Sequence, residues 1–516
     1  MAQELKSINL VAPAFQGINT EDSPLAQDPS FAEVADNAVI DKRGRIAARK
    51  GHLVTTTNKT QLGSDFLNSI KEFRDDTGTT KIFSVGNNKI LSGTTTLADE
   101  TPGSYTITAD DWKMVNFNDS IYFFQRGYEP LIYNNTAILD PGGTNGDVLQ
   151  LSTVTGAAGV TSSMYGNEVL SAYGRLWTAD FATDKSTVYW SDLLIGHDWL
   201  GGTSGSINLA KVWPDGHDEI VALSAHNNHL IIFGKRSIVV YEGADSPATM
   251  ALSDTVAGVG CVGRDTIQHT GVDVIFLSYT GLKSFGRTIQ EKSMPLSSLS
   301  NTITTDIIQL LREENEVFQS VYHPEENFYL LTFVNQDITY CFDLRGTLEN
   351  GSYRVTRWPG TGFTCYERKG DGTLLIGSLL GVGEYSGFLD NGSSYGFKYY
   401  SPELSFGDPS KLKFLKKLRP TVVGGSGLNV FLKWDYDFGY SYNTAVLTLK
   451  NEAQEAEFGK GEYTVAQFSA DILTSKEAIN TNGSGGTLSI GLETNINGKE
   501  LSLQEINVLA LIGKTI

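Results

Sequence analysis

Cysteine is scarce in this 516-residue sequence, and its spacing argues against the metal and redox sites that cysteines often form. The three cysteines, Cys261, Cys341 and Cys365, are widely separated and form no C-x-x-C pair. Neither a zinc site nor a redox pair is therefore expected. Free cysteine is among the most buried residue types, so the sequence predicts three buried thiols in a reducing cytoplasm.

Long apolar segments are missing as well. No run approaches the roughly 18 apolar residues that a membrane-spanning helix needs. The first fifteen residues, MAQELKSINLVAPAF, lack the continuous apolar core of a secretory signal. The sequence therefore predicts a soluble protein.

Cations are in the minority, with 40 Lys and Arg against 59 Asp and Glu, a formal net charge of −19. Binding to nucleic acid over the whole surface is not expected, because it needs an excess of cations that displace counterions from phosphates. Catalytic motifs are also absent: there is no P-loop and no G-x-S-x-G. The letters GVGCVG (258–263) match G-x-G-x-x-G, but β-type sequence follows instead of a βαβ unit. No catalytic residue, metal ligand or cofactor is predicted, and the protein is expected not to be an enzyme.

Short apolar strands bounded by Gly, Asn and Asp make up most of the chain, which has 54 glycines and only 14 prolines. Seven strand pairs recur at intervals of about 40 to 55 residues, a period typical of propeller blades. Their first strands begin at Lys81, Ser120, Arg175, His229, Asp273, Asn327 and Thr373. The sequence therefore predicts a mostly β protein with a β-propeller of six to eight blades; an array of sandwiches is the alternative.

Three parts are predicted along the chain. Residues 1–62 are expected to form an N-terminal arm or platform segment, and residues 63–395 the propeller. Within the propeller, SLSNTITTDIIQLLREE (298–314) predicts one helix near 299–314. Residues 396–516, with strand-like stretches such as NVFLKWDYDF (429–438) and GEYTVAQF (461–468), are expected to form a separate antiparallel β module.

Two basic clusters stand out in this acidic chain. The first lies in AVIDKRGRIAARKGH (38–52) and consists of Lys42, Arg43, Arg45, Arg49 and Lys50. If residues 39–48 form a hairpin, Arg43 and Arg45 flank the Gly44 turn on one face. Arginine forks pair bidentately with carboxylates, so the first interpretation is an assembly contact with a neighbouring protein. A solvated turn and a DNA contact are the alternatives.

The second cluster lies in KLKFLKKLRP (411–420). It consists of Lys411, Lys413, Lys416, Lys417 and Arg419. Alternating apolar residues predict a strand with one buried face. The lysines either protect a free strand edge from pairing with other chains or make a second assembly contact.

The order of these features resembles the tail nozzle proteins (tail tubular proteins) of short-tailed bacteriophages. The matching N-terminal stretches are FQGINTEDSP (15–24, with Gly17, Ser23 and Pro24) and ADNAVIDKRGRIAARKG (35–51, with Asn37, Gly44, Arg45, Arg49 and Gly51). IVALSAHNNHLIIFGKRSIVVYEG (220–243), GVGCVGRDTI (258–267) and VDVIFLSYTGLKSFG (272–286) follow in the same order. LSFGDPSKLKFLKKLRPTVVG (404–424) and SIGLETNINGKELSLQEINVLAL (489–511) are similar to the family's C-terminal module.

The resemblance implies a non-enzymatic virion protein, made in the host cytoplasm. It implies a propeller in each of six copies, which form a homo-hexameric ring below the portal and its adaptor ring. The ring continues the channel for double-stranded DNA, which passes without sequence-specific binding. Tail fibres or spikes attach at the side, and the tail tip meets the host envelope.

The charge then predicts an acidic channel wall that repels DNA and lets it slide. Two alternatives remain open: a propeller that binds or cleaves host-surface glycans, and a stopper or distal tail protein of a long-tailed phage.

Overall fold

The computed structural model describes residues 5–515 apart from 104, 109–110, 135–146, 291–297, 314–315, 440, 450–473 and 476. The protein is mostly β, as predicted. The described residues contain two α-helices, α1 (Phe285–Gln290) and α2 (Thr304–Leu310). Four 3-10 turns complete the helical part: η1 (Leu151–Thr153), η2 (Ser162–Met164), η3 (Pro247–Thr249) and η4 (Arg264–Thr266).

The helix expected near 299–314 is the short α2, and α1 was not predicted. The serines before α2 bind a neighbouring strand, which explains why the helix starts late. Ser298 Oγ donates to Leu282 O at 3.0 Å, and Ser300 Oγ accepts from Leu282 N at 3.1 Å. Serine hydroxyls that bond to backbone groups elsewhere compete with helix formation.

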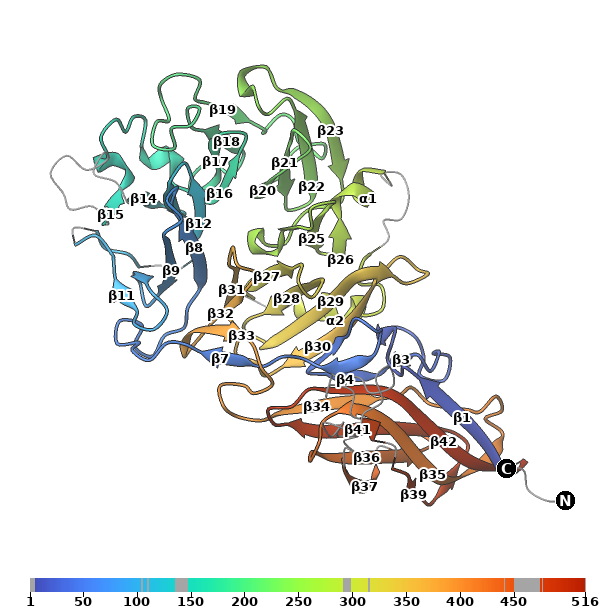
Figure 1. The fold of residues 1–516 in the computed structure, drawn as a ribbon. Helices are drawn as coiled ribbons and strands as arrows, with labels where there is room; N and C mark the ends of the chain where they lie inside the picture. Colours follow the sequence, from blue (N-terminus) through green and yellow to red (C-terminus); the bar gives the residue numbers. More distant parts are fainter. Residues whose placement is uncertain are drawn as a thin grey trace, which may run out of the picture.

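Six sets of four antiparallel strands surround a common centre in the described residues (Figure 1). The first two are β8 (Ser69–Arg74), β9 (Thr80–Gly86), β10 (Lys89–Ser92) and β11 (Ala98–Asp99), then β12 (Lys113–Phe117), β13 (Ser120–Gln125), β14 (Tyr128–Asn134) and β15 (Val148–Gln150). The next two are β16 (Gly166–Ala172), β17 (Arg175–Phe181), β18 (Thr187–Trp190) and β19 (Gly205–Asn208), then β20 (Ile220–His226), β21 (His229–Gly234), β22 (Ser237–Glu242) and β23 (Ala251–Ala257).

A three-stranded sheet and two further sets complete the ring. The three-stranded sheet is β24 (Gln268–His269), β25 (Val274–Ser278) and β26 (Gly281–Ser284). The last two sets are β27 (Phe318–His323), β28 (Phe328–Phe333), β29 (Ile338–Thr347) and β30 (Tyr353–Pro359), then β31 (Cys365–Arg368), β32 (Leu374–Ser378), β33 (Gly381–Tyr385) and β7 (His52–Val54). Contacts between β31 and β8 close the ring, so the predicted propeller is confirmed.

The seven recurring segments of the sequence are the second strands of these sheets: β9, β13, β17, β21, β25, β28 and β32. These strands lie between two partners in their own sheet and between neighbouring sheets. Every residue of β13, β17 and β28 is buried. Strands covered on both faces are expected to be continuously apolar, which is why they were the easiest to recognise.

The sheet that begins with β27–β30 continues out of the propeller into the lower part of the molecule (Figure 1). Its further strands are β4 (Val34–Asp36), β34 (Tyr395–Tyr400), β41 (Leu488–Ile496), β36 (Asn429–Tyr436) and β37 (Asn443–Thr448). The connecting strand β4 pairs in parallel with β30 through Asp36 and Arg357, and antiparallel with β34. One nine-stranded sheet therefore joins the propeller to the C-terminal module.

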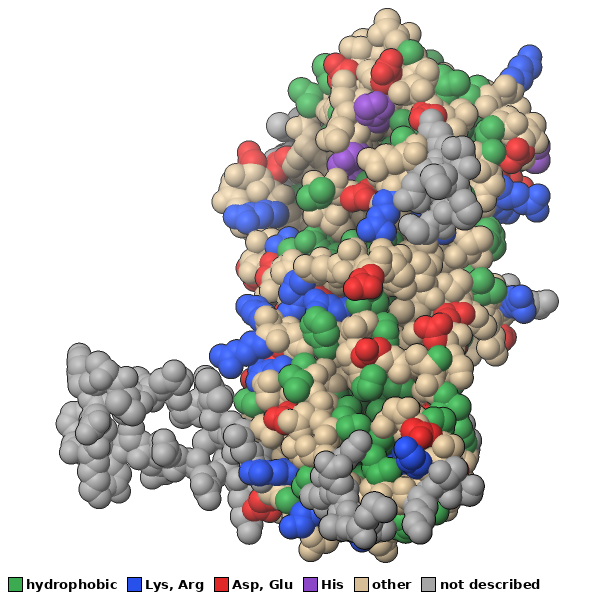
Figure 2. Space-filling model, turned by 90° about the vertical axis from the view of Figure 1, so that its right-hand side faces the viewer, with side chains coloured by type: hydrophobic (Ala, Val, Ile, Leu, Met, Phe, Trp, Pro, Cys, Tyr) green, Lys and Arg blue, Asp and Glu red, His purple; other side chains and the backbone are tan. Residues whose placement is uncertain are grey.

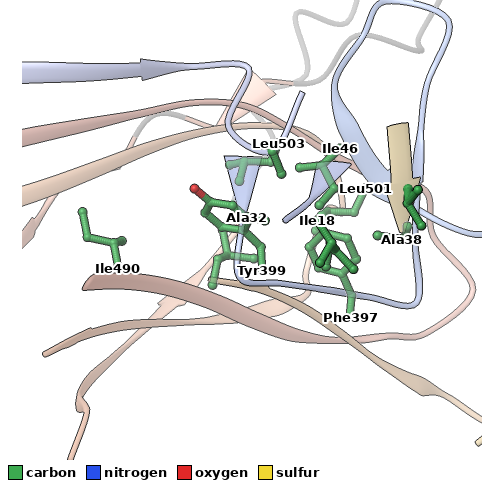
Figure 3. Close-up of a cluster of buried hydrophobic side chains, with 14 of the residues drawn as sticks. Ile18, Ala32, Ala38, Ile46, Phe397, Tyr399, Ile490, Leu501 and Leu503 are labelled. Atoms are coloured by element: carbon green, nitrogen blue, oxygen red, sulfur yellow. The ribbon is translucent and has the colours of Figure 1, made fainter. Parts of the chain in front are cut away.

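A second sheet faces this one across the core of the module. It consists of β35 (Lys411–Gly424), β42 (Leu501–Thr515), β1 (Leu5–Val11), β5 (Ala38–Ile40), β6 (Ile46–Ala48), β38 (Thr474–Ser475), β39 (Ile479–Asn480) and β40 (Ser484–Gly485). A small parallel pair consists of β2 (Gly17–Ile18) and β3 (Phe31–Ala32), and β2 packs against β30 and β4 of the nine-stranded sheet. Figure 3 shows Ile18, Ala32 and Ile46 packed with Phe397, Tyr399 and Leu503, so N-terminal and C-terminal residues share one core.

The N-terminal segment is not a separate arm, which differs from the expected division at residue 62. Strands β1, β5 and β6 belong to the C-terminal module, β4 connects the two parts, and β7 pairs with β33 in the last blade. The antiparallel β module expected over residues 396–516 is present, although GEYTVAQF (461–468) lies outside the described residues.

Gly51 lies where the chain passes from the module to the propeller, and it tolerates no side chain. A Cβ there would lie 2.0 Å from the carbonyl oxygen of Leu389. We expect Gly51→Ala to lower the melting temperature in calorimetry, because overpacking a rigid site costs about 1–3 kcal/mol. Gly346→Ala is the matched control, since nothing lies within 4 Å of a Cβ at that position. Equal melting temperatures of the two variants would contradict this account of the junction.

Candidate functional site

The basic turn predicted from the sequence forms a hairpin at the junction between propeller and module. Strands β5 and β6 pair antiparallel, and Gly44 occupies the turn with a φ of +75°. Asp41 fixes the turn, because its Oδ1 accepts from the backbone N–H groups of Arg43 at 2.8 Å and Arg45 at 2.9 Å. The predicted hairpin is therefore confirmed, and its five cations can be placed individually.

Arg49 is the most deeply buried of these cations, with 1% of its surface exposed. Its guanidinium binds Asp390 bidentately, with Nη1–Oδ1 at 2.9 Å and Nη2–Oδ2 at 2.6 Å. Its Nε donates to Asn37 Oδ1 at 2.9 Å. The charge lies 4.3 Å from the ring centre of Tyr395 and 5.7 Å from that of Trp358. Trp358 belongs to the propeller strand β30 and Tyr395 to the module strand β34, so Arg49 connects the two parts.

Asp390 is held in its charged form by this arrangement. Burial by itself raises the pKa of Asp390, but hydrogen bonds from His52 and Arg49, together with the charge of Arg49, lower the pKa to about 2. His52 Nδ1 lies 3.3 Å from Asp390 Oδ1. The pair is therefore a bidentate, largely desolvated ion pair, which is the strong kind.

Arg45 and Lys50 also have partners within the chain. Arg45 is 8% exposed and pairs with Asp41, Nη2–Oδ2 at 2.7 Å. Lys50 pairs with Glu326 and lies 5.9 Å from the ring centre of Tyr385. Arg45 and Arg49 are buried against groups of their own chain, which differs from the expected assembly contact; for Lys42, Arg43 and Lys50 that contact stays a prediction. Lys42 and Arg43 are the exposed members of the cluster.

The second basic cluster lies on β35 and also contains both buried and exposed cations. Lys413 is 1% exposed and its Nζ donates to the backbone oxygens of Asp408 and Gly486, so it is not an assembly contact. Lys411 pairs with Asp408 at 3.0 Å. Lys416, Lys417 and Arg419 are exposed. Edge protection does not explain these lysines, because β35 pairs with β42 on one side and with β38, β39 and β40 on the other.

A third charged cluster, which the sequence did not indicate, lies at the centre of the propeller. Glu168 of β16 is fully buried, and both its carboxylate oxygens lie 2.8 Å from Lys113 Nζ of β12. Its Oε1 also accepts from the backbone N–H of Leu223 on β20 at 3.2 Å. Arg264 of η4 reaches Asp111 and Asn167. Burial raises the pKa of Glu168, which the charge of Lys113 opposes.

Groups capable of chemistry are otherwise few. All three cysteines are free and buried as predicted, and burial raises the pKa of Cys261 to about 12, which disfavours the reactive thiolate. GVGCVG lies between β23 and η4. Within the described ranges, no group of three or more His, Cys, Asp or Glu side chains is placed to hold a metal ion. None of the described helices has the length and apolar character needed to cross a membrane.

Comparison with known proteins gives similarity at the level of solved structures. No protein-family model and no curated protein sequence matches this chain. The extracellular domain of the putative one component system BT4673 from B. thetaiotaomicron is 9% identical, with a TM-score of 0.39; the match covers 66% of this chain and 40% of that one. The Pan2 WD40 domain of Neurospora crassa (9%, TM-score 0.36) is matched over 66% of this chain and 95% of its own.

Removing Arg49 tests the junction. Arg49→Ala leaves Asp390 without its cation, and we expect a loss of about 3–5 kcal/mol of stability, as for other broken buried pairs. Arg43→Ala, an exposed cation of the same hairpin, should change stability by no more than about 0.5 kcal/mol.

The pH dependence of stability tests whether Asp390 is the partner of Arg49 that matters. Because the pKa of Asp390 is lowered to about 2 in the folded protein, its contribution is complete above the unfolded value of about 4 and is lost as the pH falls toward 2. The melting temperatures of the wild type and Arg49→Ala, measured by calorimetry, should therefore converge between about pH 5 and pH 2. A difference that does not change with pH would exclude this pair as the cause.

The central cluster makes a separate prediction. Lys113→Ala removes the cation that binds both carboxylate oxygens of the buried Glu168 and should cost about 3–5 kcal/mol, whereas Lys113→Ala with Glu168→Gln should recover part of this loss. Lys235→Ala is the control, because its ion pair with Glu219 is exposed and contributes about 0–1 kcal/mol. If thermal unfolding shows Lys113→Ala to be no worse than Lys235→Ala, the cluster does not stabilise the propeller.

Proposed function

We propose that this chain is a structural subunit of a phage tail, six copies of which form the nozzle ring of a short-tailed particle. Support comes from the order of sequence features, from FQGINTEDSP near the N-terminus to the closing strands, which resembles that of nozzle proteins. The fold agrees with what that resemblance implies: a propeller and an antiparallel module in each subunit.

The observation that carries the proposal is the continuous connection between propeller and module. Domains within a chain usually move relative to one another unless their interface is large and apolar. Here a nine-stranded sheet crosses the junction, and Arg49 binds groups from both sides of it. A ring subunit that is attached above and carries fibres at its side needs such a fixed orientation, because a hinge would let the attached parts swing.

The partners follow from this role. The ring would join the adaptor above, fibres or spikes at the side and the host envelope at the tip. It would also pass double-stranded DNA without sequence-specific contacts. A net charge of −19 per subunit is suited to this passage if it faces the channel, since carboxylates do not bind phosphates and the duplex stays mobile. The chemistry is passive, and no catalytic residue is assigned.

Electron microscopy of the purified protein, alone and with its adaptor, tests the proposal. We expect rings with sixfold symmetry and no hydrolysis of host polysaccharide in a reducing-sugar assay. Arg43→Ala, which leaves the junction intact, should still form rings, whereas Arg49→Ala should yield fewer rings or irregular ones. A monomer or trimer that cleaves polysaccharide would instead support a glycan-active propeller, and labelling at the tip of a long tail would support a distal tail protein.

A further inference from the structure

A groove of about 740 Å³ opens where the basic hairpin meets the last two blades of the propeller. Three turns border it: the β5–β6 hairpin, the β27–β28 turn and the β31–β32 turn. Figure 2 shows Lys and Arg side chains gathered near mid-height on one side of the face that it draws. Its volume lies in the range of pockets that bind ligands or chain segments.

Most charges inside the groove are neutralised by the chain itself. Three cations of the lining have partners there: Arg45 pairs with Asp41, Lys50 with Glu326, and Arg345 with Asp343. Such pairs leave little charge to attract a ligand. The remaining charged side chains therefore decide what the groove can recognise.

Two cations of the groove lining keep an uncompensated positive charge. Lys42 and Arg43 lie at the tip of the hairpin, both are exposed, and neither forms a salt bridge with a carboxylate among the described residues. Asp41 accepts from the backbone of the turn and fixes its shape. The two cations are therefore presented on a rigid support, which lowers the entropy cost of binding.

Two glutamates add negative charge to the lining. Glu384 and Glu500 line the groove and form no salt bridge in the described part of the chain. Glu384 of β33 is paired with Leu53 of β7, and Glu500 lies two residues before Ser502, the partner of Ala47.

The lining also contains apolar side chains, among them Val39, Phe328, Leu374, Tyr385 and Phe388. A largely apolar lining with a few placed charged groups is the usual composition of a binding pocket, because burial supplies affinity and the charges set the orientation.

We propose that this groove binds an extended segment of a partner protein that carries both an acidic and a basic residue. The acidic side chain would contact Lys42 and Arg43, and the basic one Glu384 and Glu500. The inference rests on the proposed function only in assuming that the chain joins an assembly. The sequence had assigned this role to all five cations of the hairpin, whereas the structure leaves it to two of them and adds the opposing carboxylates.

Fluorescence anisotropy with two labelled peptides of about twelve residues tests the proposal. One peptide carries an acidic pair and a basic pair in a Ser, Thr and Val background, and in the other Asn and Gln replace the charged residues. The wild-type protein should bind the first more tightly. Both Lys42→Glu/Arg43→Glu and Glu384→Lys/Glu500→Lys should weaken its binding about five- to thirtyfold, the range expected for losing two exposed ion pairs.

The chain offers a matched control in the exposed cations of β35. Lys416→Glu/Lys417→Glu makes the same change in net charge as Lys42→Glu/Arg43→Glu and should alter peptide binding less than about twofold. Equal loss in the control, equal binding of the two peptides, or no binding would overturn the proposal. The proposal would also fail if binding of a DNA duplex required Lys42 and Arg43 while binding of the peptide did not. If the peptide binds as expected but no rings form, only the nozzle proposal fails. If rings form but the peptide does not bind, only the proposed binding role of the groove is refuted.

Discussion

The bidentate pair between Arg49 and Asp390 is the contact on which the relation between the two parts of this molecule depends. Arg49 also lies against Trp358 of the propeller and Tyr395 of the module, so one guanidinium contacts both sides of the junction. A desolvated charge is costly when it loses its partner, which makes the arrangement specific: propeller and module hold together in the one orientation that satisfies both ions. Strand β4 adds backbone pairing to the same place.

The charge distribution follows a common rule in all three clusters. Cations that come near the core have carboxylates or backbone oxygens of the same chain, as in Arg49, Lys413 and Lys113. Lys42 and Arg43 at the β5–β6 turn and Lys416 and Lys417 of β35 are exposed. A dense run of basic residues in the sequence is thus a mixture of buried, paired cations and exposed ones. Only the exposed cations remain available to bind a partner.

The sequence predicted the propeller well because the second strand of each sheet is buried on both faces and reads as a continuous apolar run. It predicted the β5–β6 hairpin from Gly44 and its neighbours, which is also a local signal. It did not predict that residues 1–62 are shared between both parts, because their partners lie far along the chain: Arg49 and Asp390 are 341 positions apart. Periodicity carries no information on such pairings, so the burial of Arg45 and Arg49 could not be seen in advance. The central Glu168 cluster was missed for the same reason.

Strand β7 has a consequence for biosynthesis. His52 and Asp390 lie 338 positions apart, and β7 completes a sheet whose other strands are made much later on the ribosome. The propeller therefore cannot close while the chain is still emerging, and its early strands wait with an open edge. Such long-range closure is slow and exposes strands that other chains could pair with. High expression at elevated temperature should accordingly favour aggregates over correctly folded chains, and slow synthesis should favour correct closure.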